Sequence, residues 1–239
     1  GGKLINIRQD GLERILYFDF ECMNELGDMV TITLACEIMG RYSNMILINQ
    51  NGKVMDSLKR VDAEMSRERL VLPNVTYELP PRDSRLNFLT ASKEDIISAI
   101  KSQPNGDLAK TLIKVFEGVS PILCREWVYY ATNGFDIKTF DLTTEYLDRL
   151  LYIINQTKMK LLNAQCSFTV VQTKDGQLKD YSFIDLHQYE DLMNTIHFNN
   201  AFDLLDYFYS QRDSYARLKQ RADDLFKLLT STNERITKK

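Results

Sequence analysis

Apolar and polar residues alternate with a period of two through much of the first ninety residues, and this pattern restricts the possible folds more than any other feature of the chain. Such alternation predicts strands that each bury one face, and turn formers such as Asn51-Gly52 separate the runs. We therefore expect an antiparallel β meander with strands near residues 15–20, 29–39, 44–49 and 54–61. In the second strand the pattern places Ile32, Leu34, Cys36 and Ile38 toward a core and Thr31, Thr33 and Ala35 away from it.

Helix signals replace this pattern after Pro80-Pro81. Ser92 is an N-cap candidate, because its hydroxyl can accept a bond from a first-turn amide, and Ser120-Pro121 has the form of a second helix start. The sequence predicts helices near residues 92–103, 108–117, 121–132 and 143–159. Between residues 168 and 186 the period of two returns, which predicts a separate β-hairpin.

The chain from Asn200 to its end contains neither Gly nor Pro and predicts one long helix. Its apolar residues are separated by steps of three and four, which is the seam of a coiled coil that needs a partner strand from elsewhere in a longer chain. The seam comprises Leu204, Phe208, Tyr215, Leu218, Ala222, Leu225, Leu229 and Ile236, with Gln211 and Thr232 in the two gaps. The segment from Arg212 to Lys239 has eight basic residues against four acidic ones, whereas the whole chain has a net charge of −3.

These patterns together predict an α+β protein. Its expected parts are an antiparallel β domain at residues 1–90, a helical domain at 91–165, a returning β-hairpin at 166–198 and the start of a coiled-coil arm at 199–239. The acidic balance also means that any nucleic-acid surface must be local, and the arm is one candidate because its charge is basic.

Several classes of function are disfavoured by the same sequence. No apolar run reaches the roughly 18–20 residues of a membrane helix, and the first residues lack a signal-peptide core, so we expect a cytoplasmic protein with no membrane partner. The four cysteines are far apart and only two histidines are present, so we expect no metal. Phosphate-loop, dinucleotide-binding and hydrolase motifs are absent from the sequence, so we expect neither catalysis nor a cofactor.

The segment from Leu112 to Val128 has the pattern of a helix-hairpin-helix. A short turn at Gly118, Val119 and Ser120 joins two helices, and the amides of a helix start favour a phosphate oxygen. Arg125 follows one helical turn later and can add a charge-assisted bond. The alternative interpretation is that two helices simply turn on a glycine.

Nine short segments, spread in order over nearly the whole chain, resemble the NFACT family, to which bacterial RqcH (also called fibronectin-binding protein A) and eukaryotic NEMF belong. The segments are Asn24–Asp28, Glu37–Asn44, Ile46–Ile48, Asp56–Arg60, Leu72-Pro73, Tyr77–Pro81, Gly118–Pro121, Phe202–Tyr209 and Arg217–Ala222. The resemblance implies a MutM-like N-terminal fold, helix-hairpin-helix elements and a coiled-coil arm. It also implies that this chain is an internal fragment of the N-terminal region.

The resemblance implies a ribosome-associated quality-control factor. Such a factor binds the large ribosomal subunit obstructed by peptidyl-tRNA, recruits alanyl-tRNA and supports untemplated alanine tailing of the stalled chain. On this basis we expect the basic arm, with Arg212, Arg217, Lys219 and Arg221, to contact ribosomal RNA.

The family carries an Asp-Arg pair, implicated in tRNA handling, where this chain has Glu13-Arg14. The resemblance therefore implies tRNA binding by Glu13 and Arg14, although the longer glutamate changes the reach of the carboxylate. From the residues alone, a cross-strand ion pair worth about 0.2–1 kcal/mol is the alternative. Glu37 and Arg41 are interpreted as scaffold, since a Glu before a hairpin often holds a turn in place.

Two other functions remain open from the sequence. The older family name suggests a surface adhesin that binds fibronectin, although the residues show no signal peptide, anchor or repeat to support it. The resemblance of the fold to MutM suggests a DNA-binding repair protein. The catalytic residues of that enzyme lie at its extreme N-terminus, which this chain is expected to lack, so glycosylase activity is disfavoured.

Overall fold

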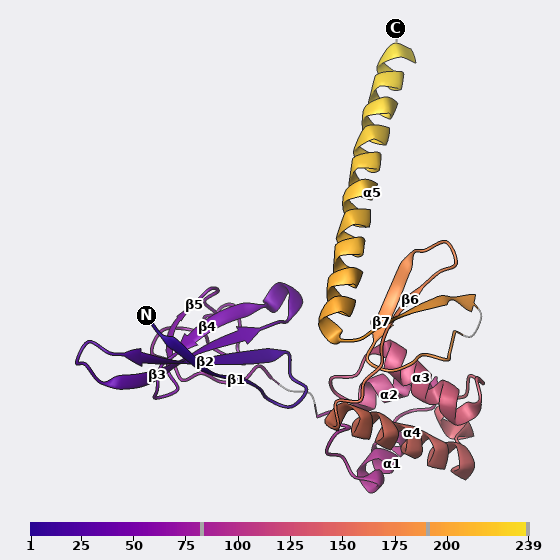
Figure 1. Cartoon of the computed structure of the whole chain (residues 1–239), viewed down its shortest axis with the longest axis horizontal. Helices are drawn as coiled ribbons and strands as arrows, with labels where there is room; N and C mark the ends of the chain where they lie inside the picture. Colours follow the sequence, from indigo (N-terminus) through magenta and orange to yellow (C-terminus); the bar gives the residue numbers. More distant parts are fainter. Residues whose placement is uncertain (82–83, 190–191, 238–239) are drawn as a thin grey trace. The chain divides into compact units, whose positions relative to one another are not determined.

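The computed structural model of the chain describes residues 1–81, 84–189 and 192–237, without the side chains of 232 and 234–237. The chain forms two compact units. The first comprises Gly1–Ala91 with Phe116–Gly118, and the second comprises Ser92–Val115 with Val119–Lys239. The architecture is α+β with antiparallel sheets and five α-helices among the described residues (Figure 1).

The first unit contains a five-stranded sheet in the order β1-β2-β3-β4-β5. All four neighbouring pairs are antiparallel, which confirms the predicted meander and adds one strand before it, β1, that was not predicted. The strands are β1 (Lys3–Gln9), β2 (Ile15–Met23), β3 (Met29–Glu37), β4 (Asn44–Ile48) and β5 (Val54–Ser57). The turn after β4 contains Asn49, whose side-chain oxygen accepts bonds from the amides of Asn51 and Lys53 at 2.9 and 3.0 Å.

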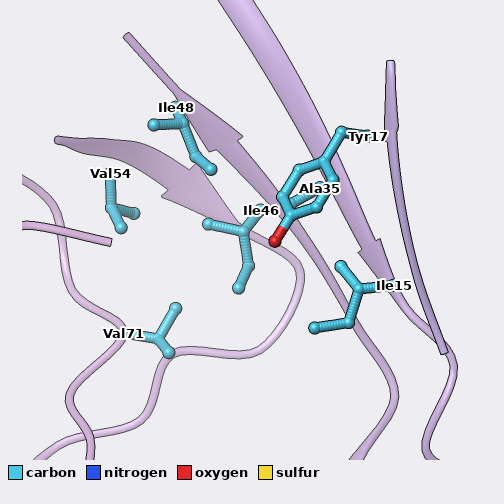
Figure 2. Packing of buried hydrophobic residues seen from close by; sticks show 7 residues of the cluster. All are labelled: Ile15, Tyr17, Ala35, Ile46, Ile48, Val54 and Val71. Carbon is cyan, nitrogen blue, oxygen red and sulfur yellow. The ribbon is translucent and has the colours of Figure 1, made fainter. Parts of the chain in front are cut away.

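The buried face of this sheet is opposite to the one predicted from the alternation in β3. Ala35 is fully buried and Cys36 is half-buried, while Ile38 is 54% exposed. The prediction for this strand was wrong because the segment after β5 packs on the Ala35 face, where Val61, Val71 and Tyr77 contribute to the core. Figure 2 shows the buried cluster of Ile15, Tyr17, Ala35, Ile46, Ile48, Val54 and Val71.

The other face of the sheet carries a larger number of apolar side chains and is half-buried. Cross-strand pairing places Phe18 between Ile7 and Leu34, and Leu34 next to Leu47. Ile7 is 56% exposed, and the other three are half-buried. The face is therefore only partly covered by the described part of the chain.

The second unit contains four helices near the predicted positions, and two of them begin at the predicted caps Ser92 and Ser120. They are α1 (Lys93–Lys101), α2 (Leu108–Val115), α3 (Pro121–Thr132) and α4 (Thr144–Leu162). The Ser92 hydroxyl accepts a bond from the amide of Asp95, whose carboxylate in turn accepts the Ser92 amide, as in a capping box. Trp127 of α3 is fully buried, and its indole Nε1 donates to Oγ1 of Thr157 in α4 at 2.9 Å.

The predicted hairpin is part of a three-stranded sheet in the order β7-β6-β8. Its strands are β6 (Phe168–Gln172), β7 (Leu178–Ser182) and β8 (Asn194–Phe198). The third strand was not predicted, because its five residues contain only two large apolar side chains and a local pattern of that length is weak. Leu204 and Phe208 pack on Val170 of β6 and so fix the start of the last helix.

The last helix, α5 (Ala201–Thr237), is the longest element of the chain (Figure 1). After its first turns the seam residues are exposed: Tyr215, Leu218, Leu225 and Leu229 are each 59–64% exposed. Two 3-10 helices, η1 (Gly40–Tyr42) and η2 (Thr139–Asp141), complete the described structure. No helix in the described ranges is both long and apolar enough to span a membrane.

Candidate nucleic-acid interface

Glu13 and Arg14 lie in the turn between β1 and β2. The Glu13 amide donates to the Asp10 carbonyl at 3.1 Å, and the Glu13 carbonyl accepts a bond from Nε2 of Gln9 at 2.7 Å, so two hydrogen bonds hold this turn. Arg14 is exposed, and its side chain has no ion pair within the described residues. Among the described residues Arg14 therefore has no ion-pair partner, and its exposed guanidinium can meet a ligand.

The segment that follows β3 lies directly beside this turn. The amide of Ile38 donates to the carbonyl of Arg14 at 2.8 Å, so Arg14 is joined by its backbone to the strand end that leads into η1. Arg41 and Tyr42 of η1 are both exposed, and the Arg41 guanidinium carbon lies 4.6 Å from the centre of the Tyr42 ring. The Lys59 ammonium donates to the carbonyl of Arg41 at 3.1 Å. Arg14, Arg41 and Lys59 thus contribute three positive charges from neighbouring turns.

A pocket of about 680 Å³ opens next to η1, and we call it the Arg41 pocket. Cationic residues line it together with an aromatic ring, apolar side chains and the two carboxylates of Glu37 and Glu68. Its lining includes Arg41, Tyr42, Lys59, Arg60, Met65 and Pro80. Arg60 is paired with Asp56 at 3.3 Å, and both side chains are exposed, so this pair contributes little to stability. The pocket combines cations with an apolar surface on which a ring can stack.

The inner wall of the Arg41 pocket is a buried ion pair. The Glu37 side chain is 2% exposed and Arg69 is 11% exposed. Arg69 Nη1 donates to Glu37 Oε2 at 3.0 Å, and Nη2 donates to Oε1 in the bidentate arrangement. The Tyr77 hydroxyl also donates to Oε1 at 3.0 Å. Burial and the nearby Tyr17 and Glu37 raise the pKa of Tyr77, so its hydroxyl remains a donor.

Glu37 and Arg41, both assigned to the scaffold from the sequence, have different roles in the structure. Glu37 does hold the scaffold, because its charge is neutralised by Arg69 inside the protein. Arg41 is exposed on the neighbouring turn and reaches the pocket. The signal available in the sequence was an Arg-Tyr pair next to Gly40, whose φ of 59° allows the tight turn that exposes them.

The turn between α2 and α3 has the predicted helix start. Gly118 has a φ of 66°, and a Cβ there would lie 2.6 Å from the Leu12 Cβ, so both conformation and space require glycine. Gly118 and Ser120 are exposed and Val119 is half-buried. The Ser120 hydroxyl accepts the Leu123 amide at 3.3 Å, so this donor of the first turn is already used by the N-cap.

Arg125 has protein partners. Its Nε donates to Gln188 Oε1 at 3.1 Å, and its Nη2 donates to the Tyr189 hydroxyl at 3.3 Å. The adjacent Glu126 is buried and accepts the amides of His187 and Gln188 at 2.8 and 3.0 Å. Arg125 therefore helps to hold residues 187–189 against α3, and a phosphate would have to compete with these bonds.

The predicted basic residues of the arm, Arg212, Arg217, Lys219 and Arg221, are all exposed on α5. The Arg212 guanidinium carbon lies 4.8 Å from the centre of the Tyr209 ring, so this arginine is held next to the first turns of the helix. The arm can therefore present its charge to a polyanion along its length.

Over residues 1–239 the chain matches the family described as NFACT N-terminal and middle domains. The protein named Rqc2 homolog RqcH from Bacillus subtilis (strain 168) is 29% identical over 247 residues, which cover 100% of this chain and 39% of that protein. The protein of the same name from Streptococcus suis (strain 05ZYH33) is 29% identical over 240 residues, which cover 100% and 38%. The chain therefore spans less than half the length of these relatives.

Two solved structures share the fold. The fibrinogen binding protein from Staphylococcus aureus superposes with a TM-score of 0.67 at 27% identity, covering 87% of this chain and 71% of that chain. The N-terminal part of the fibronectin/fibrinogen-binding protein from Streptococcus suis gives a TM-score of 0.59 at 27% identity, covering 88% and 68%.

Proposed function

Because the chain belongs to the NFACT family, we propose that it is the RNA-binding N-terminal part of a ribosome quality-control factor. The relatives named Rqc2 homolog RqcH support this assignment. In this proposal the chain binds the obstructed large ribosomal subunit with its peptidyl-tRNA and recruits alanyl-tRNA. It thereby supports alanine tailing, while the ribosome forms the peptide bonds.

The proposal gives each part of the structure a role. The five-stranded sheet is part of a MutM-like domain that handles tRNA, and α2 and α3 form a helix-hairpin-helix that contacts a phosphate backbone. The α5 helix is the start of a coiled-coil arm, whose exposed seam takes a partner strand from another part of a longer chain and whose basic residues contact ribosomal RNA.

The single observation that carries the proposal is a group of exposed cations on neighbouring turns. Arg41 and Lys59 line the Arg41 pocket, and the backbone of Arg14 is bonded to the segment that leads into η1. Three cations from adjacent turns can neutralise phosphates, and Tyr42 offers a ring on which an unpaired base can stack. The inner wall of the pocket is electrically neutral, because Glu37 is paired with Arg69. Arg60 is paired with Asp56, and the other charged lining residues, Arg41, Lys59 and Glu68, leave a net positive charge although the whole chain is acidic.

RNA binding is tested by fluorescence anisotropy with labelled tRNA and by co-sedimentation with large ribosomal subunits. We expect affinity to fall steeply with salt, because each neutralised phosphate releases counterions. Arg14→Ala and Arg41→Ala should each lower affinity and reduce the slope of log K against log salt by about 0.7–0.9.

Arg149→Ala is the matched control, since it removes the same charge from α4 in the second unit, where Arg149 pairs with Glu145. It should leave tRNA affinity unchanged within about twofold if binding is local. Binding that is insensitive to salt, or equal losses in all three variants, would refute the proposed surface.

A second candidate function is fibronectin or fibrinogen binding, because the two similar solved structures carry those names. Immobilised fibronectin and fibrinogen would be titrated with the chain in parallel with tRNA. Saturable binding to either protein that Arg41→Ala leaves unchanged would favour this second function at a different surface.

A further inference from the structure

A second cleft of the first unit shares no lining residue with the Arg41 pocket. It has a volume of about 680 Å³, within the range of small-molecule sites, and we call it the Arg8 cleft. Strands β1, β2 and β3 supply one wall, and the turn after β4 supplies another. The residues used below are Arg8, Tyr17, Thr31, Thr33, Gln50 and Tyr77.

Arg8 is held at the wall of this cleft by an ion pair and by the ring of Tyr17. Its Nε donates to Oδ2 of Asp19 at 3.0 Å, and its guanidinium carbon lies 4.2 Å from the centre of the Tyr17 ring. Because one face of the guanidinium covers the ring while the side chain is still 50% exposed, the opposite face is available to a ligand. Planar arginine groups of this kind are platforms on which bases stack.

The charge of Arg8 is balanced within the protein. Asp19 is 8% exposed and also accepts the Thr33 hydroxyl at 2.7 Å. Arg8 and Asp19 therefore form a neutral pair, unlike the cations around the Arg41 pocket. A neutral ligand suits this cleft better than a phosphate or a carboxylate, since an anion would meet the Asp19 charge close behind the arginine.

The rim of the Arg8 cleft carries both hydrogen-bond donors and hydrogen-bond acceptors. Within the described part of the chain, the Thr31 hydroxyl, the Gln50 amide and Nη1 of Arg8 have no hydrogen-bond partner. Together they provide donors and acceptors around a flat surface. The edge of a nucleobase carries the same mixture and no charge.

From these features we infer that the Arg8 cleft binds one unpaired nucleobase of RNA, stacked on the guanidinium of Arg8 and read at its edge by Thr31 and Gln50. The inference rests on the proposed RNA binding and adds a neutral, base-reading site to the cationic surface. Tyr77 connects the two sites, because its ring lines the Arg8 cleft and its hydroxyl bonds to Glu37 in the wall of the Arg41 pocket.

The direct test is a titration of the isotope-labelled chain with each of the four ribonucleosides and, separately, with inorganic phosphate. We expect at least one nucleoside to shift the NMR signals of Arg8 Nε–H and the Gly52 amide, and phosphate to leave them unchanged. Arg8→Lys keeps the charge beside Asp19 but loses the planar platform, and should weaken nucleoside binding about 5- to 150-fold, the range of 1–3 kcal/mol per stacked base.

A second variant leaves the ion pair between Arg8 and Asp19 intact. Gln50→Ala changes an exposed turn residue and should weaken the same nucleoside, whereas Gln177→Ala, in the exposed turn between β6 and β7, should not. Shifts confined to residues outside the cleft, equal shifts with phosphate, or unchanged nucleoside affinity in both Arg8→Lys and Gln50→Ala would overturn the inference.

The two proposals fail in different ways. If the cleft reads a base within bound RNA, Arg8→Lys lowers tRNA affinity with an unchanged salt slope, whereas Arg41→Ala lowers the slope itself. If the wild-type chain shows no salt-dependent tRNA binding, the proposed function is refuted. NMR shifts caused by a nucleoside in the Arg8 cleft would still support the base-binding site. Normal tRNA binding without nucleoside shifts would refute the cleft alone.

Discussion

Truncation of Arg69 to alanine tests how the Arg41 pocket is built. The change removes the bidentate partner of Glu37, whose carboxylate is 2% exposed and would retain only the Tyr77 hydroxyl as a donor among the bonds described here. A buried charge that loses its partner costs about 3–5 kcal/mol. Total stabilities of domains are about 5–15 kcal/mol, so the first unit should lose a large share of its stability.

The assay follows each unit separately. Hydrogen exchange read by mass spectrometry reports β3 in the first unit, while the fluorescence of Trp127, the single tryptophan, reports the second. In urea, Arg69→Ala should expose the β3 amides at a much lower concentration than the wild type, with the Trp127 transition retained. Arg67→Ala, an exposed neighbour, is the control and should change stability by less than about 0.5 kcal/mol.

A double substitution separates the lost pair from the lost packing. Glu37→Met with Arg69→Met removes both charges and keeps apolar volume, so it should recover most of the stability lost in Arg69→Ala. If Arg69→Ala lowers the free energy of unfolding by less than about 1 kcal/mol, or if the double variant is as unstable as Arg69→Ala, the ion pair between Glu37 and Arg69 does not stabilise the inner wall of the Arg41 pocket.

Three further predictions concern other parts of the chain. Burial raises the pKa of Asp19, but hydrogen bonds from Thr33 and Arg8 outweigh burial and hold the pKa below 3.8. The carboxylate of Asp19 therefore stabilises the fold above pH 3.8, and this stabilisation is lost as the pH falls through the pKa of the folded state. An acid denaturation series should show this loss in the wild type and not in Asp19→Asn. Burial raises the pKa of the Cys124 thiol to about 12, so iodoacetamide should label it only when the second unit unfolds, as peptide mapping across a urea series would show. Phe208→Ala should cost about 3–5 kcal/mol and release the base of α5 from its sheet, measurable as faster exchange at the start of α5, and unchanged exchange there would contradict the packing.

Local elements were predictable because their causes are local. The Ser92 and Ser120 caps, the proline after the second of them and the Asn51-Gly52 turn act through groups a few residues away, and the structure has helices and strands at these places. The β8 strand was missed because five residues carry too little periodicity to be recognised without their neighbour β6.

The buried face of the first sheet and the layout of the candidate site depended on distant contacts. Alternation shows that two faces differ, but it does not show which face the chain covers, and the return of Val71 and Tyr77 over Ala35 decided this. Similarly, the family resemblance marked Glu13-Arg14, and the residues alone assigned Glu37 and Arg41 to the scaffold. Only the folded chain joined them, through the bond between Ile38 and Arg14, and only burial distinguished the neutralised Glu37 from the exposed Arg41.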